Sequence, residues 1–575
     1  MPTPADEENP SAKRVPHAAG HRPRVPILEW LRGYERSWLS ADLVAGLTAA
    51  AVVIPKAMAY ATVAGLPVQV GLYTAFVPAI VYAVLGGSRV LSVSTTTTLG
   101  ILTAAALGEA VPGAGSAQLV TAVATLTLLV GAILVGAALL RLGFVANFIS
   151  EPVLAGFKAA IGLVIIVDQV PKLLGIHIEK VGFFRDVGHI LSGARETSVP
   201  TLLVSVALAA LILALRRWVP KVPAPLVAVA LAIAVSALFH LPALGVKPIG
   251  AIPGGLPSPT WPDPGLLGSL WAGAVGIALM SFTETIAAGR AFAAPGEPPS
   301  SANRELLATG LASVAGGLLG AMPAGGGTSQ TAVNRRVGAH TQLAGLITGL
   351  TGLATILVLA PALSLMPQAT LATIVVIYSA ELVSPRDFRA IVAVRRTEFL
   401  WALTAFAGVL LLGTLRGIVV AVILSVVSLA HQSSNPPVYE LARKPGTNVF
   451  RRRSDEHPGD ETTPGLFLVR VEGRIYFGNA QRVLDLLTPI ALAASPRVIA
   501  LDCSAIVDVE YSALKMLAEA EERVRRHGAE LWLASVNPDV LRVLDRAPLG
   551  KALGRERMCF NVESAVERYH ARGDG

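Results

Sequence analysis

AVVIPKAMAYATVAGLPVQVGLY, residues 51–73, is the stretch that decides how this chain folds. It is apolar enough to lie in a bilayer, yet Pro55 removes a helical hydrogen bond within it and Lys56 adds an ammonium group. Lys56 lies about thirteen residues beyond the start of the apolar run near Leu43, or roughly 20 Å at helical rise. The alternative is a side chain that snorkels to an interface. We favour a place on a transport pathway, because an ammonium group at that depth needs a counter-charge or water.

The composition is that of a polytopic membrane protein. Hydrophobic residues make up 53% of the 575 residues and charged residues only 15%, whereas about a quarter of the residues in soluble domains are charged. Many of the 54 glycines stand within apolar runs, where bilayer helices approach closely. The net charge of +8 does not indicate nucleic-acid binding, because the Lys and Arg residues are spread between apolar segments.

Apolar runs long enough to cross the roughly 30 Å hydrocarbon core recur between Leu43 and Ala430. We predict about fourteen helical spans, of which the third and the tenth are short and polar at one end. The approximate centres of these spans are Val53, Val77, Leu102, Leu129, Leu163, Leu208, Leu231, Leu279, Leu311, Ala332, Gly352, Val375, Phe406 and Leu424.

The basic residues agree with an even number of spans. From Arg89 in the first such loop to Arg396 in the last, they fall in every second connection, with Arg416 as a lone exception among the short connections; the longer stretches 172–199 and 241–265 are less diagnostic. By the positive-inside rule both termini are therefore expected in the cytoplasm. Residues 1–40 are polar and basic and lack a cleavable signal peptide pattern, so the first apolar segment is expected to target and anchor the chain in the cell (inner) membrane.

The chain divides into four parts. An N-terminal cytoplasmic segment is expected over residues 1–40 and an all-α transmembrane domain over residues 41–432. Residues 433–463 are polar and contain prolines, which predicts a linker. Residues 464–572 alternate between strand and helix patterns, which predicts a small cytoplasmic α/β domain with a covered sheet.

The cysteines indicate neither a disulfide framework nor a metal site. Cys503 and Cys559 are the only two, and neither has a Cys or His at metal-ligand spacing. No metal and no cofactor is predicted.

Two polar clusters interrupt the apolar spans. LSVSTTTTLGIL (residues 91–102) places hydroxyl groups before a helical stretch, and MPAGGGTSQTAVNRR (residues 322–336) places three glycines before Thr328 and Ser329. The hydroxyls of each cluster would cap a half-helix that begins within the membrane and directs its N–H groups at an anion. The alternatives are hydroxyls that bond back to their own helix and a Gly-rich reverse turn.

IALMSFTETIAAGRAF (residues 277–292) places Glu284 in the middle of the eighth span. A carboxylate there is either protonated or paired with a cation, and we expect its partner to be Lys56. The alternative is a purely structural ion pair. The first and eighth spans, like the third and tenth, are seven spans apart, which is the spacing of a seven-plus-seven inverted repeat.

These stretches resemble the sulfate permease family of anion transporters, whose members end in a STAS domain. The matching segments are DLVAGLTAAAVVIPKAMAYATVAGLP (residues 42–67), GGSRVLSVS (86–94), SFTETIAAGRAFA (281–293), GGGTSQTAVNRRVGAHTQLAGLITG (325–349) and the region 464–572. The resemblance implies fourteen spans in two inverted repeats, a core domain that holds the anion, a gate domain, and a homodimer. It implies small inorganic or organic anions as substrates, among them sulfate, bicarbonate, chloride and dicarboxylates.

Carried onto this chain, the resemblance implies an anion site between the two half-helices and proton coupling at Glu284. The implied substrate-binding residues are Lys56, Tyr60, Thr96, Thr97, Thr98, Gly327, Thr328, Ser329 and Gln330.

The chain departs from the family pattern in three places: Lys56 replaces the usual Gln, Ser94 and Thr95 replace a Gly-Pro, and Gln330 replaces a frequent basic residue. We hypothesise that Lys56 supplies the missing positive charge and pairs with Glu284 when no anion is bound. The same geometry is compatible with sulfate, bicarbonate or a carboxylate.

In the soluble domain, Ser512 lies close to the phosphorylatable hydroxyl of STAS relatives. A regulatory serine and a plain helix cap are the two interpretations, and we favour the cap.

The sequence thus predicts a secondary transporter of small anions, coupled to protons and working by alternating access. An anion exchanger or channel without proton coupling is the main alternative, and it would not need a titrating Glu284. A membrane-anchored signalling protein would not need paired polar positions in both halves. An enzyme is not expected, because the spans contain no recognisable nucleophile and base arrangement or metal cluster.

Overall fold

The computed structural model describes residues 26–148, 150–178, 182–220, 222–293, 297 and 300–573. Residues 1–25 of the expected N-terminal segment lie outside this described part. The chain forms two compact units, residues Met1–Ser425 and Val426–Gly575.

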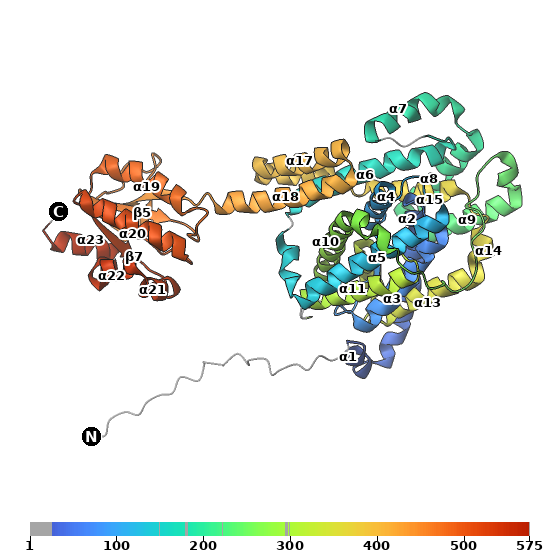
Figure 1. Cartoon of the computed structure of the whole chain (residues 1–575), viewed down its shortest axis with the longest axis horizontal. Helices are drawn as coiled ribbons and strands as arrows, with labels where there is room; N and C mark the ends of the chain where they lie inside the picture. The colour runs from blue at the N-terminus through green and yellow to red at the C-terminus, as the bar shows by residue number, and fades with distance from the viewer. Residues whose placement is uncertain are drawn as a thin grey trace, which may run out of the picture. The chain divides into compact units, whose positions relative to one another are not determined.

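All the expected span centres lie in helices, which are drawn in Figure 1. In chain order these helices are α2 (Leu39–Val63), α3 (Val68–Leu85), α4 (Thr97–Ala110), α5 (Ser116–Leu139), α6 (Glu151–Leu174), α8 (Val199–Trp218), α9 (Ala224–Phe239), α10 (Leu267–Ala291), α11 (Ala302–Leu318), α12 (Thr328–Val337), α13 (Leu343–Ala354), α15 (Gln368–Ala380), α17 (Arg396–Leu412) and α18 (Thr414–Ser433).

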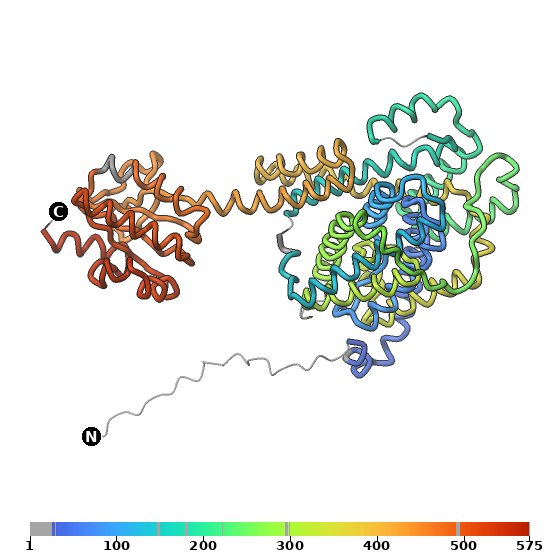
Figure 2. Tube along the Cα trace, viewed as in Figure 1, coloured from blue at the N-terminus to red at the C-terminus, as the bar shows by residue number. Residues whose placement is uncertain are grey.

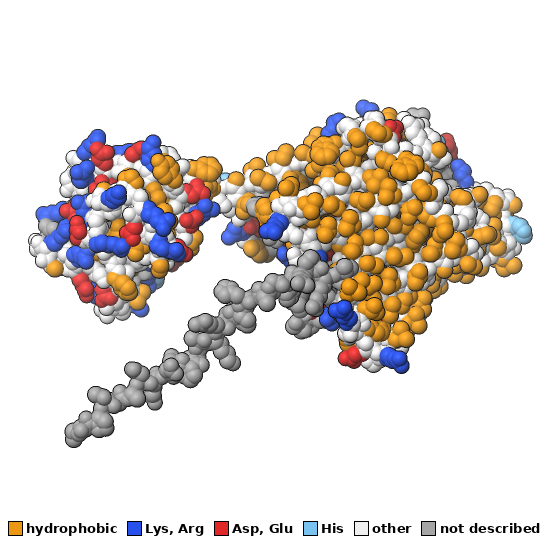
Figure 3. All heavy atoms as spheres, turned by 60° about the horizontal axis from the view of Figure 1, so that its bottom comes forward, with side chains coloured by type: hydrophobic (Ala, Val, Ile, Leu, Met, Phe, Trp, Pro, Cys, Tyr) orange, Lys and Arg blue, Asp and Glu red, His pale blue; other side chains and the backbone are white. Residues whose placement is uncertain are grey.

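The lengths of these helices agree with a membrane domain that contains half-helices. Within the described ranges, nine helices are long and apolar enough to cross a membrane. The third and tenth spans are shorter than the roughly 20 residues that a full crossing needs, because α4 has 14 residues and α12 has 10. Figure 3 shows apolar side chains over most of the visible face of the N-terminal unit, as expected of a surface that contacts lipid.

The packing of the helices repeats after seven spans. The first span, α2, packs on the eleventh span, α13. Seven spans further on, the eighth span, α10, packs in the equivalent way on the fourth span, α5. Similarly, α3 packs on α13 as α11 packs on α5. In Figure 2 the blue trace of α3 lies beside the green-to-yellow traces of α11 and α13. These equivalent contacts are the signature of the inverted repeat.

The contacts divide the spans into a core and a gate. The core consists of α2 to α5 and α10 to α13. In the gate, α6 packs on α15 and α17, and α8 packs on α9 and α15. Helix α2 also contacts α15, α9 and α6, so the first span lies at the boundary between the two groups.

Several helices were not expected from the hydropathy pattern. They are α1 (Pro26–Arg32), α7 (Phe183–Gly193), α14 (Ala360–Leu363), which continues α13 through a π-helical segment Thr355–Leu359, and α16 (Pro385–Val394). Helices α7 and α16 bury no residue and carry charges, so a search for long apolar runs passes over them.

The C-terminal unit is a six-stranded sheet in the order β4-β3-β5-β6-β7-β8. Strands β5 (Leu466–Val471), β6 (Val498–Asp502), β7 (Glu530–Ala534) and β8 (Met558–Cys559) are parallel. Alternate side chains of the strands enter two apolar clusters, one including residues of α20 to α22 and one including residues of α23. The helices of this unit are α19 (Ala480–Ala494), α20 (Tyr511–Arg526), α21 (Pro538–Leu544), α22 (Pro548–Leu553) and α23 (Val562–Ala571).

The segment 433–463, expected as a linker, contributes two strands to this sheet. Strand β3 (Val438–Arg443) pairs antiparallel with β5, and β4 (Phe450–Arg452) pairs with β3. Both strands carry charged residues, which resemble a loop when only the local sequence is considered, and β4 lies at an edge of the sheet, where charged residues are common.

We predict that Gly156→Ala destabilises the gate. A Cβ atom at Gly156 of α6 would lie 2.0 Å from the carbonyl oxygen of Ala402 in α17, so the two helices would have to separate. Overpacking of this kind costs about 1–3 kcal/mol. The measurement is the thermal unfolding midpoint of the purified protein in detergent.

Gly136→Ala in α5 is the matched control, since a Cβ there meets nothing within 4 Å. The control should unfold at the parent temperature or slightly above it. Equal midpoints for both variants would contradict the close packing of α6 and α17.

Candidate functional site

The two polar clusters meet in a short antiparallel pair of strands. Strand β1 (Val93–Ser94) precedes α4, and β2 (Gly325–Gly326) precedes α12. Val93 pairs with Gly326 and Ser94 with Gly325. The pairing satisfies backbone groups that would otherwise lack partners inside the membrane. We expected two facing helix starts, but not the strand pairing that joins them.

The two helix starts are built differently. Thr96 is the N-cap of α4, and its Oγ1 accepts a hydrogen bond from the Leu99 amide at 3.3 Å. The N-cap of α12 is Gly327, which makes no side-chain cap. Our expectation that Thr328 and Ser329 cap this helix was wrong, because both are already helical and an N-cap residue must be non-helical.

Gln330 ties the two half-helices together. Its Nε2 donates to the Ser92 carbonyl and to Ser94 Oγ, both at 3.0 Å, and the side chain is buried. The amide of Gln330 thus crosslinks the break before α4 to the first turn of α12.

Lys56 is buried between the core and the gate. Its Nζ donates to Ser329 Oγ at 2.8 Å and lies 3.5 Å from the ring centroid of Tyr378 in α15. The other cation on this ring is Arg216, whose Cζ is 4.4 Å from the centroid and which forms an ion pair with Glu381 at 2.6 Å. Lys56 therefore has a polar partner on the core and an aromatic partner on the gate.

The expected ion pair between Lys56 and Glu284 is not formed by these two described side chains. Glu284 instead accepts a hydrogen bond from Thr96 Oγ1 at 2.7 Å. The reason is that Thr96, as the N-cap of α4, presents a hydroxyl donor directly to the carboxylate. The carboxylate thus lies at the positive end of α4.

One small cavity brings the predicted residues together. Its volume is about 100 Å³, which is below the usual range for organic ligands and suits a small ion. Tyr60, whose hydroxyl lies 2.6 Å from Thr97 Oγ1, lines it from α2. The other predicted residues in the lining are Lys56, Thr96, Thr97, Thr98, Glu284, Gly327, Thr328, Ser329 and Gln330.

Two residues at this site were missed from the sequence. Lys158 of α6 lines the same cavity, and it was detectable as a charged residue within the fifth span. Tyr378 carried no signal, because a tyrosine in an apolar span is unremarkable until the fold places it against Lys56.

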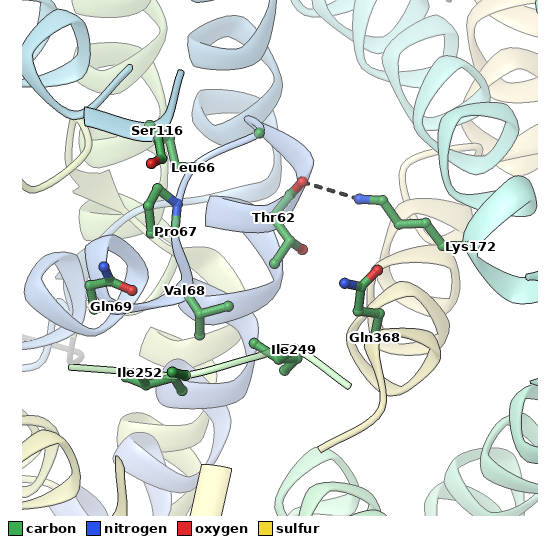
Figure 4. A pocket seen from close by; sticks show the side chains of 12 residues that line it. Thr62, Leu66, Pro67, Val68, Gln69, Ser116, Lys172, Ile249, Ile252 and Gln368 are labelled. Carbon is green, nitrogen blue, oxygen red and sulfur yellow. Dashed lines mark hydrogen bonds between the residues drawn. The ribbon is translucent and has the colours of Figure 1, made fainter. Parts of the chain in front are cut away.

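A second cavity, of about 420 Å³, lies at the C-terminal end of α2. It is shown in Figure 4, where Lys172 from the last turn of α6 donates to the Thr62 carbonyl at 3.1 Å. Residues of the core and of the gate line this cavity, but none of the predicted site residues does.

Ser512 is not the cap of its helix. Helix α20 begins at Tyr511 and its N-cap is Glu510, so Ser512 is the second helical residue and its side chain is exposed. Our preferred interpretation of Ser512 as a cap was therefore wrong. The hydroxyl is accessible at the positive end of a helix.

Comparisons with known proteins agree with this architecture. The model of the sulfate permease family matches residues 39–405, and that of the STAS domain matches residues 457–565. A Mycobacterium tuberculosis protein named as a probable sulfate transporter is 35% identical over 554 residues, covering 95% of this chain and 98% of that protein. Sulfate transporter 4.1, chloroplastic, of Arabidopsis thaliana is 31% identical and covers 94% of this chain and 82% of its own.

Solved structures share the fold. The murine solute carrier 26 family member A9 anion transporter in the inward-facing state superposes with a TM-score of 0.88 at 20% identity, covering 99% of this chain and 100% of that one. The transmembrane domain of a cyanobacterium bicarbonate transporter, BicA, superposes with a TM-score of 0.60 at 23% identity, covering 68% of this chain and 98% of that one. With the two half-helices, the inverted repeat and the C-terminal sheet, these matches establish that the chain belongs to the sulfate permease family of membrane anion transporters and ends in a STAS domain.

Proposed function

We propose that this protein is a proton-coupled symporter of small anions that works by alternating access, with the anion bound in the cavity between α4 and α12. The observation that carries the proposal is the hydrogen bond from Thr96 Oγ1 to Glu284 Oε2 at 2.7 Å. It holds a protonatable carboxylate at the N-terminus of a helix that would otherwise offer its positive end to the substrate.

The proposed coupling follows from competition for that positive end. An ionised Glu284 places a negative charge beside the start of α4, where a substrate anion would also be stabilised. Two negative groups at one site repel each other, so protonation of Glu284 favours anion binding. Lys56 supplies a positive charge that does not depend on Glu284, since the ammonium is held by Ser329 and Tyr378.

Orientation and assembly are part of the proposal. Basic residues fall in every second short connection along the chain, which supports cytoplasmic termini in a cell (inner) membrane protein. The resemblance supports a homodimer. The substrate is drawn from sulfate, bicarbonate and carboxylates, and the relatives named above as sulfate transporters favour sulfate.

We predict that Glu284→Gln abolishes the response of uptake to an inward proton gradient. The neutral amide cannot take up a proton, so the start of α4 stays open to the anion at every pH. The measurement is uptake of labelled sulfate, bicarbonate and fumarate into proteoliposomes, each with and without the gradient. The parent protein should accumulate at least one of them only with the gradient.

Glu109→Gln, at the exposed end of α4, is the control and should respond as the parent does. Uptake by the parent that ignores the gradient, or a gradient response that survives Glu284→Gln, would favour an exchanger or channel.

We predict that Tyr378→Leu weakens anion binding. The ring face holds the Lys56 ammonium at the cavity, and such contacts contribute about 0.5–2 kcal/mol, or roughly 2- to 30-fold in Kd. Tyr378→Phe keeps the ring face and should stay near the parent value. Isothermal titration of the purified protein checks both variants, and equal Kd values for Leu and Phe would argue against the contact.

We propose further that phosphorylation of Ser512 regulates transport. A phosphate there would interact with the positive end of α20 and compete for Arg474, which forms ion pairs with Asp508 at 2.9 Å and Glu510 at 2.7 Å. Ser512→Asp should alter the maximal uptake rate while Ser512→Ala keeps the parent rate. Identical rates for both variants and for protein phosphorylated at Ser512 would exclude this regulation.

A further inference from the structure

Lys158 is a charged side chain that the proposed mechanism has not used. It lies about seven residues, or roughly 10 Å, from the start of α6, within a span that is long and apolar enough to cross the membrane. In the ranges that the structure describes, its ammonium group makes no hydrogen bond or ion pair. An ammonium group without a counter-charge is costly inside a membrane domain and marks a place where an anion or water is bound.

The side chain lines the cavity between α4 and α12. A lysine at this depth has the alternative of snorkelling to the interface. Lys158 is half-buried and lies in the lining of the small cavity together with Lys56 and Glu284. Among the described lining residues these three are the lysine and carboxylate side chains.

The charges in the cavity match a divalent anion. When both lysines are protonated, the lining has a net charge of +1 with Glu284 ionised and of +2 with Glu284 protonated. A divalent anion neutralises the lining when Glu284 is protonated, whereas a monovalent anion leaves one ammonium group without a counter-charge. An unbalanced charge is costly in a low-dielectric cavity, so the lining favours the divalent anion.

The two lysines belong to different parts of the transport domain. Lys56 is on α2 of the core, and Lys158 is on α6 of the gate. An anion that contacts both ammonium groups would bridge the core and the gate in this arrangement of the helices.

We propose that Lys158 is a second anion-contacting residue and gives the cavity a preference for divalent oxyanions, either tetrahedral such as sulfate or elongated such as a dicarboxylate. This inference rests on the proposed anion site between α4 and α12. It does not depend on proton coupling, because it concerns the charge of the anion rather than its driving force.

The test compares anions of one shape and different charge. Sulfate and perchlorate are both tetrahedral, and fumarate and crotonate share a carbon skeleton, so each pair isolates the second charge. The Kd of each anion is measured by isothermal titration with the full-length purified protein at low ionic strength, and uptake into proteoliposomes is measured in parallel. The pair that shows the preference separates a tetrahedral from an elongated substrate.

The parent protein should bind the divalent member of at least one pair more tightly. Lys158→Gln should weaken binding of that divalent anion by roughly tenfold, the scale of one charge-assisted hydrogen bond, and leave the monovalent anion within about twofold. Lys158→Arg keeps the charge and should keep the preference.

Lys172→Gln is the matched control. It removes a lysine from the same helix, but Lys172 lines the other cavity (Figure 4), so the charge preference should not change. A preference unchanged in Lys158→Gln, a parent protein that binds both members of each pair equally, or equal losses in both lysine variants would each overturn the proposal. Failure of proton coupling would appear separately, as uptake that ignores the proton gradient while the charge preference persists.

Discussion

The constraint on which the transport domain depends is that two helices begin inside the membrane, where water does not satisfy their free backbone groups. Strands β1 and β2 meet this constraint by bonding to each other immediately before α4 and α12. Strand β2 needs residues without side chains, because a Cβ at Gly326 would lie 2.8 Å from the Thr285 Cα in α10. Gln330 then adds side-chain bonds to Ser92 and Ser94. The helix ends are thus fixed in position, and residues of their first turns line the cavity.

The charged groups at the cavity are kept apart rather than paired. Lys56 contacts Ser329 and Tyr378, and Glu284 contacts Thr96. A direct ion pair between Lys56 and Glu284 would neutralise both charges. The pair would then attract an anion only weakly, because the Coulombic attraction within it would already offset the desolvation of its two ions. Separate neutral partners stabilise each group, and in the proposed mechanism they leave Lys56 able to respond to an anion and Glu284 to a proton.

Much of the fold was predictable because the bilayer imposes simple rules on sequence. Every span centre expected from span length and apolar runs lies in a helix. The residues expected to bind the anion or to couple a proton line one cavity, whereas Ser512 lies in the C-terminal unit. The failures concern choices between competing neighbours. Whether Glu284 bonds to Lys56 or to Thr96 depends on the relative depth of three helices, which no local pattern records. Tyr378 and the strand β3 likewise acquire their roles only from residues distant in the chain.

The division between backbone and side chains at the cavity has a consequence for substrate choice. Helix N-termini attract any small anion, because N–H groups and the helix dipole respond to negative charge and not to a particular chemical group. Selectivity must therefore arise from the side chains that complete the lining, and these come from α2 and α6 as well as from the half-helices. A substitution such as Lys for Gln at position 56 changes the charge of the lining, while the β1–β2 pair and the hydrogen bonds of Gln330 involve other residues. The fold can remain constant across relatives that carry different anions, because the half-helices are held together by the β1–β2 pair and by Gln330. The charge of the lining is set by other residues, namely Lys56, Lys158 and Glu284.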